Sequence, residues 1–305
     1  MDFPKRAFCF VFLTFLFSGC DGDSSKKRHT VFRQSITLPV AWLVIEWNGR
    51  PDVMASGFLV DKKKGVFVTA KHFTDALDDL LTDEIKVFFN GKVYSASLAG
   101  LAGLRDAALL KLEEPFDPAD FPEPYRIADE PVSVGDTVFI QGFHSHPLWL
   151  STANKNNGRP DRMVFVLDDY YHVVMLDPTK KINVVFDNLK AVVLRLDTKH
   201  QIGKPGSGQS YLNRIRNEVN TYTDVRTVHN HVTSFGGLSG GAATNKDGEL
   251  TGIITAEAPQ RFEFDPKGRL LTPRGFLIRG KLVRDEISVT PIAEIKDLLR
   301  RIHEW

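Results

Sequence analysis

A single serine, Ser239, lies among glycines in the stretch FGGLSGGA, residues 235–242. Glycines on both sides allow backbone angles and close approaches that a Cβ atom would forbid, so the chain can turn sharply here. A serine hydroxyl is a poor nucleophile until a base takes its proton, and that base needs a carboxylate to orient it. If Ser239 is a nucleophile, we expect a histidine and an acidic residue elsewhere in the chain to activate it. A flexible Gly/Ser loop is the plainer alternative.

A histidine and an aspartate in suitable settings occur earlier in the sequence. His72 ends a predicted strand in GVFVTAKHF, directly after an apolar run that would fix its backbone, and Asp106 opens another in GLRDAALLKL. Taken singly, each residue has a structural alternative, because histidines end strands and aspartates cap turns in many proteins. Together with Ser239 they predict acyl-transfer chemistry by a serine nucleophile.

The same serine also satisfies G-x-S-x-G, the nucleophile motif of α/β-hydrolases, and Asp285 with His303 would supply the acid and the base in that fold's order. That fold needs a helix directly after the serine. The sequence GAATNKDGEL predicts a turn at Asp-Gly instead, which disfavours this alternative.

Two histidine pairs could present imidazoles on one strand face to a zinc ion: His144 with His146, and His229 with His231. Zinc sites need three or four ligands in tight geometry, and no cysteine or helical histidine pair joins either pair. We therefore expect loop histidines, no metal site and no cofactor.

Short strands fill the first half of the chain, from residue 36 to residue 112. The runs are ITLPVAWLVIEW, MASGFLV, GVFVTAKHF, IKVFFNG, KVYSASLAG and AALLKL, and turn signals such as DKKKG separate most of them. They predict an N-terminal antiparallel barrel over residues 35–125. The stretch EEPFDPADFPEP, with four prolines, predicts a linker.

A second strand series, from PVSVGDTVFIQGF to GFLIRGKLV, predicts a C-terminal barrel over residues 126–290 with a long insertion at about 144–231. Within that insertion DRMVFV, INVVF and AVVLRL still predict strands, whose topology stays open. In TPIAEIKDLLRRIHEW, Thr290 can cap a helix and Pro291 suits its first position, so residues 291–305 predict an amphipathic helix. The fold class is all-β: two six-stranded antiparallel barrels and a C-terminal α-helix.

Several of these stretches occur in a fixed order in one protein family. SGFLV, VFVTAKHF, RDAALLKL, VGDTVFIQGF and GLSGGAATNKDGELTGI follow the order of trypsin-like serine proteases of the chymotrypsin fold. The chain resembles the bacterial HtrA/Deg-type branch of that family most closely, over about residues 36–143 and 233–290. HtrA-type enzymes carry a PDZ domain after the protease, and we expect none in the residues that follow Ser239.

The resemblance implies a role for each site residue. His72 is the general base, Asp106 orients it, and Ser239 is the nucleophile, with the N–H groups of Gly237 and Ser239 as the oxyanion hole. Thr233, Thr255, Ala256 and Glu257 line the substrate pocket. None of these is trypsin's buried aspartate, so we expect small or medium apolar side chains, with a basic residue selected by Glu257 as the alternative. Leu238 replaces the aspartate that digestive members pair with a newly cut N-terminus, so activation by that cut is not expected.

Residues 1–19 differ in composition from the rest. Lys5 and Arg6 precede the apolar run AFCFVFLTFLF, which predicts a signal peptide too short to span a bilayer. FSGC resembles the lipobox of bacterial lipoproteins, with Phe17 in place of leucine, and implies a lipid on Cys20. An ordinary signal cleaved near Gly19 is the alternative. Residues 20–34 then form a tether, and Asp21 favours retention at the inner membrane, facing the periplasm.

The composition is that of an ordinary globular protein. Of the 305 residues, 42% are hydrophobic and 25% charged, and the net charge of +1 gives no reason to expect nucleic acid as a partner. We therefore expect an exported serine endopeptidase that hydrolyses polypeptide substrates in the bacterial cell envelope. Its partners would be those substrates, the membrane through its lipid, and a regulatory protein. A catalytically inactive lipoprotein of the same fold, binding peptides or scaffolding a complex, is the second expectation.

Overall fold

The computed structural model describes most of the chain between residues 38 and 302. The described ranges are 38–47, 50–80, 82, 84–90, 92–147, 163–166, 182–199, 219–228, 235–257, 263–264, 270–271, 277–278, 281–282 and 286–302. The proposed lipid site at Cys20 lies outside these ranges.

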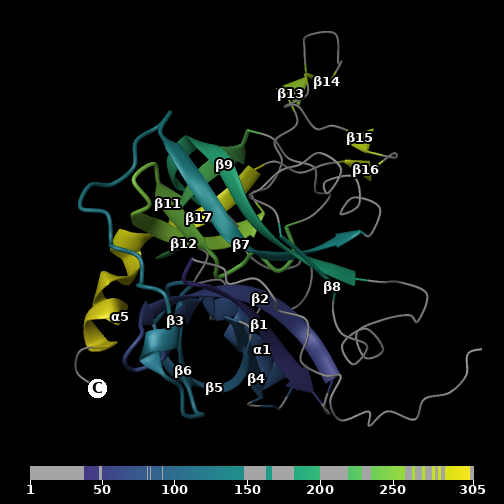
Figure 1. The fold of residues 1–305 in the computed structure, drawn as a ribbon. Coiled ribbons are helices and arrows are strands. Elements are labelled where there is room, and N and C mark those ends of the chain that lie inside the picture. Colours follow the sequence, from purple (N-terminus) through teal and green to yellow (C-terminus); the bar gives the residue numbers. More distant parts are fainter. Residues whose placement is uncertain are drawn as a thin grey trace, which may run out of the picture.

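The N-terminal half forms barrel 1, a closed barrel of six antiparallel strands in the order β1-β2-β3-β6-β5-β4 (Figure 1). Its strands are β1 (Val40–Trp47), β2 (Arg50–Asp61), β3 (Val66–Thr69), β4 (Ile85–Phe89), β5 (Lys92–Leu101) and β6 (Ala108–Leu112), and helix α1 (Lys71–Leu80) follows β3. All six predicted strands of this half are present. The lysines of DKKKG lie in the tight β2–β3 turn, where Asp61 Oδ1 accepts the N–H groups of Lys63 and Lys64.

Strand β1 is apolar at almost every position because both of its faces are buried. Ala41, Leu43 and Ile45 belong to the core inside barrel 1, together with Phe73 of α1. Val40, Trp42 and Val44 point to the opposite face, since side chains alternate along a strand, and join the core shared with barrel 2 and the C-terminal helix. The unbroken run VAWLVI therefore holds the two halves together.

The C-terminal half forms barrel 2. Its sheet has the order β10-β17-β12-β11-β7-β9-β8, and the pairing of β10 with β9 closes six of these strands while β8 extends the sheet. The strands are β7 (Thr137–Pro147), β8 (Met163–Val166), β9 (Ile182–Thr198), β10 (Tyr222–Thr227), β11 (Ala242–Asn245), β12 (Leu250–Glu257) and β17 (Glu286–Pro291). The predicted fold class of two six-stranded antiparallel barrels is confirmed.

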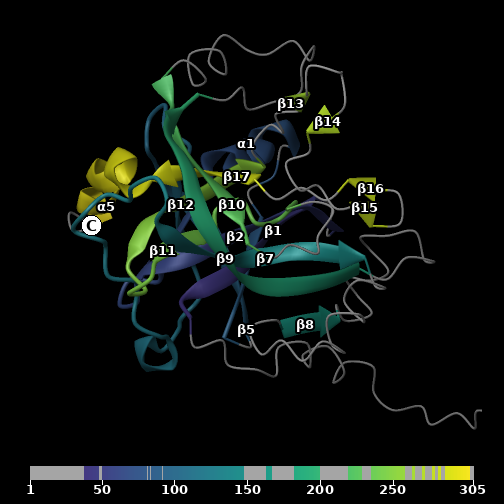
Figure 2. The same ribbon diagram turned by 90° about the horizontal axis from the view of Figure 1, so that it is seen from above.

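Two details of barrel 2 differ from the expectation. INVVF and AVVLRL form one long strand, β9, which pairs with β7 over residues 182–192 (Figure 2) and with β10 near its end. β9 and β10 are therefore barrel strands inside the predicted insertion. The described residues of GFLIRGKLV do not enter the barrel. They form β15 (Leu277–Ile278) and β16 (Lys281–Leu282), which pair with each other, and β17 closes the barrel instead. A further small pair is β13 (Glu263–Phe264) with β14 (Leu270–Leu271).

Charged side chains join the three strands at which barrel 2 closes. Arg195 of β9 donates from Nε to Asp224 of β10 (3.0 Å) and from Nη2 to Glu286 of β17 (2.7 Å). Burial lowers the pKa of Arg195, but its hydrogen bonds to Glu286 and Asp224 outweigh this and raise the pKa above its ordinary value. The guanidinium stays charged, and it neutralises two carboxylates that would be costly to bury alone.

The chain then continues into a short helical segment beside both barrels (Figure 1). Pro291 is the last residue of β17 and not a helical residue, and the helix begins with a 3₁₀ turn, η3 (Ile292–Ile295), followed by α5 (Lys296–Arg301). Thr290 caps nothing, because its hydroxyl bonds that of Thr255. The predicted apolar face does pack into the shared core through Ile292, Ile295, Leu298, Leu299 and Ile302.

The predicted linker contains one 3₁₀ turn, η2 (Pro118–Asp120), and is anchored by Phe121. The Phe121 ring is buried against Phe89 in the core of barrel 1, with ring centroids 5.0 Å apart. Within the described ranges, no helix has the length and apolar character needed to cross a membrane.

Candidate active site

His72 and Asp106 meet because they follow and precede two paired strands. β3 pairs antiparallel with β6, and Thr69 lies opposite Ala108. His72 comes three residues after Thr69 and Asp106 two residues before Ala108, so both lie at the same end of the barrel. The sequence predicts His72 at a strand end, but the strand stops at Thr69. His72 lies in the first turn of α1, which opens with a hydrogen bond from the Phe73 N–H to the Ala70 carbonyl.

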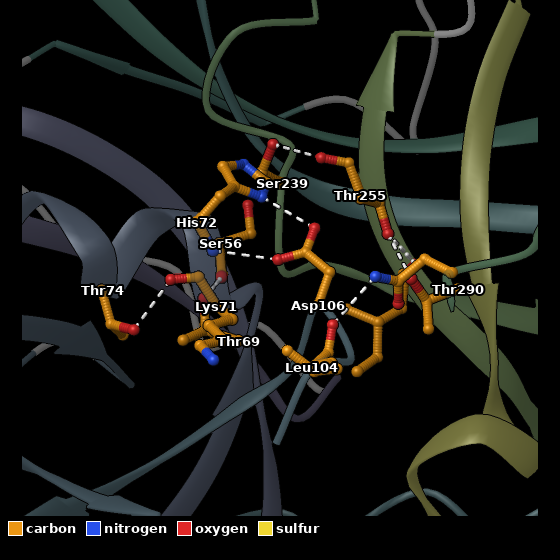
Figure 3. Close-up of polar contacts among 12 residues, drawn as sticks. Ser56, Thr69, Lys71, His72, Thr74, Leu104, Asp106, Ser239, Thr255 and Thr290 are labelled. Carbon is orange, nitrogen blue, oxygen red and sulfur yellow. Dashed lines mark hydrogen bonds and ion pairs between the residues drawn. The ribbon is translucent and has the colours of Figure 1, made fainter. Parts of the chain in front are cut away.

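Both oxygens of the Asp106 carboxylate contact His72 (Figure 3). Oδ1 accepts the backbone N–H of His72 at 2.9 Å, and Oδ2 lies 2.9 Å from Nδ1 of the ring. The Asp106 side chain is 6% exposed and that of His72 is 32% exposed, so the carboxylate is shielded while the ring reaches solvent. A carboxylate only accepts, so Nδ1 carries a proton and Nε2 of the neutral ring is left as the proton acceptor.

The loop that carries Asp106 is tied to other parts of the molecule. Lys71 donates to the Gly103 carbonyl, and the side-chain amide of Asn220, just before β10, donates to the Leu104 carbonyl at 2.9 Å. Arg105 donates to the Val219 carbonyl at 2.6 Å and forms an ion pair with Glu294 of η3 at 2.7 Å. These contacts hold the Asp106 backbone from both barrels.

The glycines around Ser239 are needed for two different reasons. Gly237 has φ +100° in a turn closed by the bond from the Leu238 N–H to the Phe235 carbonyl, a conformation that residues with a side chain rarely adopt. Gly240 has φ +85°, and a Cβ there would lie 2.1 Å from the backbone oxygen of Ser56. Ser239 is therefore carried on a turn pressed directly against barrel 1.

Ser56 of β2 makes that contact specific, and sequence reasoning missed it. Its backbone N–H donates to the Ser239 carbonyl at 2.8 Å, and its hydroxyl donates to the Gly237 carbonyl at 2.8 Å. The same hydroxyl accepts the N–H of Phe143 at 2.7 Å. Ser56 is fully buried. One residue of barrel 1 thus bonds the residues on both sides of Leu238. The motif SGFLV indicates that Ser56 lies on a strand, but not that it contacts this turn.

The Ser239 hydroxyl donates to the backbone carbonyl of Thr255 at 2.9 Å. Thr255 lies at an irregularity in the pairing of β12 with β17, where an extra residue leaves the regular ladder. In the view of Figure 3 the His72 ring lies between Asp106 and Ser239. A hydroxyl has one proton, so it must turn away from Thr255 to give that proton to His72.

Among the described residues, the N–H groups of Gly237 and Ser239 donate to no protein acceptor. Both are therefore open to an oxygen atom of a bound molecule.

Of the expected pocket residues, Thr255 is fully buried on β12, and Ala256 and Glu257 follow it on the same strand. Thr233 lies outside the described residues. Leu238 is buried and faces Gly142 of β7.

The expectation of a loop histidine is wrong for His144, which lies on strand β7 and has a carboxylate partner. His144 and Asp187, on the paired strands β7 and β9, are both fully buried, and His144 Nε2 bonds Asp187 Oδ2. The Cα of His144 would lie 3.2 Å from a Cβ placed on Gly237, so the backbone that carries the His144–Asp187 pair packs directly against the turn at Gly237. Among the described residues, no group of three or more His, Cys, Asp or Glu could hold a metal ion.

The element after Ser239 is a strand, β11, followed by a turn at Asp247-Gly248 and by β12. The helix that an α/β-hydrolase requires at this place is not there, and His303 lies outside the described residues.

A match to a protein-family model agrees with this architecture. Residues 55–253 match the trypsin-like peptidase domain family, which is more than half of the chain. Among solved structures, the active form of the Rv3671c protease from M. tuberculosis is similar, with 14% identity, a TM-score of 0.48, and 87% of this chain and 82% of that chain covered. The serine endoprotease from Yersinia pestis is similar with 18% identity, a TM-score of 0.46, and 88% and 64% coverage. No curated protein matches the sequence.

Proposed function

Because the chain belongs to the trypsin-like peptidase family, we propose that it is a serine endopeptidase whose catalytic residues are His72, Asp106 and Ser239. The observation that carries the proposal is the bidentate contact of Asp106 with the backbone and the ring of His72. It leaves Nε2 as the acceptor on the side of the ring that faces Ser239 in Figure 3.

The reaction begins when a substrate carbonyl reaches Ser239. The hydroxyl leaves the Thr255 carbonyl and gives its proton to His72 Nε2, while Oγ bonds the carbonyl carbon. The N–H groups of Gly237 and Ser239 bind the oxyanion, worth ~2.7–4 kcal/mol of barrier per donor. His72 then gives the proton to the leaving amine, and Asp106 stabilises the transient imidazolium. Water, activated in turn by His72, hydrolyses the acyl-enzyme to the product acid.

The substrates and the location belong to the same proposal. Thr233, Thr255, Ala256 and Glu257 would form a pocket for a small or medium apolar side chain, and Glu257 would be the residue that admits a basic one instead. Cys20 would carry a lipid that holds the enzyme on the periplasmic side of the inner membrane. A mature protein without an N-terminal lipid mass would refute the anchor.

A second candidate is a peptide-binding protein of the same fold that does not turn over its ligand. The observation that favours it is the Ser239 hydroxyl, which donates to Thr255 in this structure. Such a scaffold would tolerate Ser239→Ala without a change in phenotype.

Fluorophosphonate labelling of the full chain, followed by intact mass, separates these candidates. We expect one label on the wild type, none on Ser239→Ala, almost none on His72→Ala, and normal labelling of His303→Ala. Loss of label in His303→Ala but not in His72→Ala would overturn the assignment of the base. A folded wild type that takes no label, alone or with peptide, would favour the scaffold.

A further inference from the structure

Barrel 2 contains a cavity of about 490 Å³ that the proposed reaction does not use. All six strands of the closed barrel line it, through Val138, Leu196, Val225, Ala243, Thr251 and Val289. Its mouth is formed by the exposed lining residues, which are Asp129, Glu130, Pro131, Ser133, Leu196, Asp197, Ala293 and Lys296. Thr251 lies four residues before Thr255 on β12, and none of His72, Asp106 and Ser239 belongs to the lining. The cavity is therefore separate from the candidate active site.

The cavity exists because the side chains at this end of barrel 2 are small. Barrel 1 fills its interior with Phe67, Phe73 and Phe89. In the corresponding cluster of barrel 2, Phe235 is the one aromatic residue among the described part of the chain. Phe235 does not line the cavity, and the strand residues that do are mostly Val, Ala and Thr, which leave space. Protein interiors are close-packed, and mouths of β-barrels are frequent ligand sites of this size.

A threonine hydroxyl lines the cavity. Thr223 of β10 is 6% exposed, and its strand partner Val289 lines the same space. Among the described residues, no hydrogen-bond partner contacts the Thr223 side chain. The hydroxyl lines the cavity and is therefore available to a polar group on an occupant.

The mouth is acidic. Asp129, Glu130 and Asp197 line it, are exposed, and have no ion-pair partner among the described residues. Lys296 is the one basic residue of the lining, and Glu294 is engaged by Arg105. Leu196, 39% exposed, adds apolar surface at the same rim. An apolar interior behind an acidic rim suits a ligand that joins an apolar group to a cation.

We propose that this end of barrel 2 is a second ligand site, which takes an apolar group bearing an ammonium or guanidinium. The apolar group enters between the strands, a polar atom meets the Thr223 hydroxyl, and the cation stays between Asp129, Glu130 and Asp197. Such a ligand comes either as a free amphiphilic amine or as a polypeptide segment with Leu or Phe next to Lys or Arg.

Photo-crosslinking tests the site on the full chain with Ser239→Ala, so that no peptide is cleaved. The probes are an alkyl diazirine ending in an ammonium and the same diazirine ending in a carboxylate, and the labelled residues are mapped by mass spectrometry. We expect saturable labelling of the cavity strands, at least tenfold stronger with the ammonium. Equal labelling by both probes, or none in the cavity, would overturn the proposal.

Variants identify the site. Ala293→Trp, at an exposed position of the mouth, should block labelling, and joint Asp129→Asn, Glu130→Gln and Asp197→Asn should lower it at least tenfold. Thr223→Val should lower it severalfold, and Lys296→Gln should raise it. If the folded Ala293→Trp variant and the folded triple rim variant are labelled as strongly as the parent protein, the proposed site is wrong.

Competition identifies the source of the ligand. Displacement of the probe by hexylammonium alone indicates a free amine, and displacement by an acetylated Lys-Leu-Arg-Phe amide indicates a polypeptide. Failure of both competitors contradicts the proposed chemistry. The site does not depend on catalysis, so fluorophosphonate labelling of the same variants with Ser239 restored tests the proposed function separately.

Discussion

The hydroxyl of Ser56, in barrel 1, donates to the backbone carbonyl of Gly237, in barrel 2, at 2.8 Å. The backbone N–H of Ser56 bonds the Ser239 carbonyl at the same distance. The turn that would hold the oxyanion is thus fixed from the opposite barrel. The backbone geometry at Ser239 therefore depends on how the two barrels pack together as well as on the local sequence.

Ser56→Ala should therefore slow turnover more than it weakens substrate binding. The change leaves the Gly237 carbonyl and the Phe143 N–H buried without their partner, which costs about 1–3 kcal/mol of unfolding free energy. We expect kcat to fall by about 10–10² as the N–H groups lose their alignment, with KM nearly unchanged. Steady-state kinetics and thermal unfolding measure both effects. Ser97→Ala on β5 is the matched control, and equal kcat values for the two variants would contradict this role.

Comparing Gly240 with Gly248 tests how closely the two barrels approach each other at Gly240. Both have positive φ, +85° and +78°, but a Cβ on Gly240 meets the backbone of Ser56 and Ala70, whereas a Cβ on Gly248 meets nothing within 4 Å. We expect Gly248→Ala to cost about 1–2 kcal/mol from backbone strain alone. Gly240→Ala should cost about 4 kcal/mol or more, or prevent folding. Chemical denaturation tests this, and similar losses for both variants would show that the contact is not tight.

Much of this architecture could be predicted from local patterns. Strands such as VAWLVIEW are apolar on both faces, and the glycines around Ser239 reflect demands that act within a few residues. The prediction that GFLIRGKLV is a strand of barrel 2 is wrong because an apolar run between turn signals has the same sequence pattern whether it enters a barrel or forms a separate hairpin. Pro291 misled because a proline suits both the end of a strand and the start of a helix.

The parts that escaped prediction depend on contacts between distant segments. Nothing near Ser56 in the sequence indicates Gly237, 181 positions away. Likewise His144 reads as half of a histidine pair until β9 brings Asp187 beside it. The lining of the cavity in barrel 2 comes from residues on six separate strands. Such features follow from strand pairing, which a single sequence does not specify.

Arg105 should matter through its neighbour Asp106. It joins the Asp106 loop to Glu294 and to the Val219 carbonyl, and its side chain is 29% exposed. We expect Arg105→Ala to cost about 1 kcal/mol and to lower kcat/KM severalfold, since the loop gains freedom. Arg300→Ala, which removes an ion pair with Asp297 in which both side chains are largely exposed, is the control and should change neither quantity. If Arg105→Ala behaves like Arg300→Ala, the loop is held by Lys71 and Asn220 alone.

Asp106→Asn should abolish most activity without unfolding the protein. The backbone N–H of His72 needs an acceptor, so the amide oxygen takes the place of Oδ1 and turns the NH₂ group toward Nδ1 of the ring. Nδ1 must then accept, which moves the ring proton to Nε2 and leaves no base facing Ser239. We expect kcat to fall by about 10⁴, the scale of this change in a serine-protease triad. Asp78→Asn, exposed on α1, controls for the loss of a charge. A folded Asp106→Asn enzyme with near-normal kcat would remove Asp106 from the proposed mechanism.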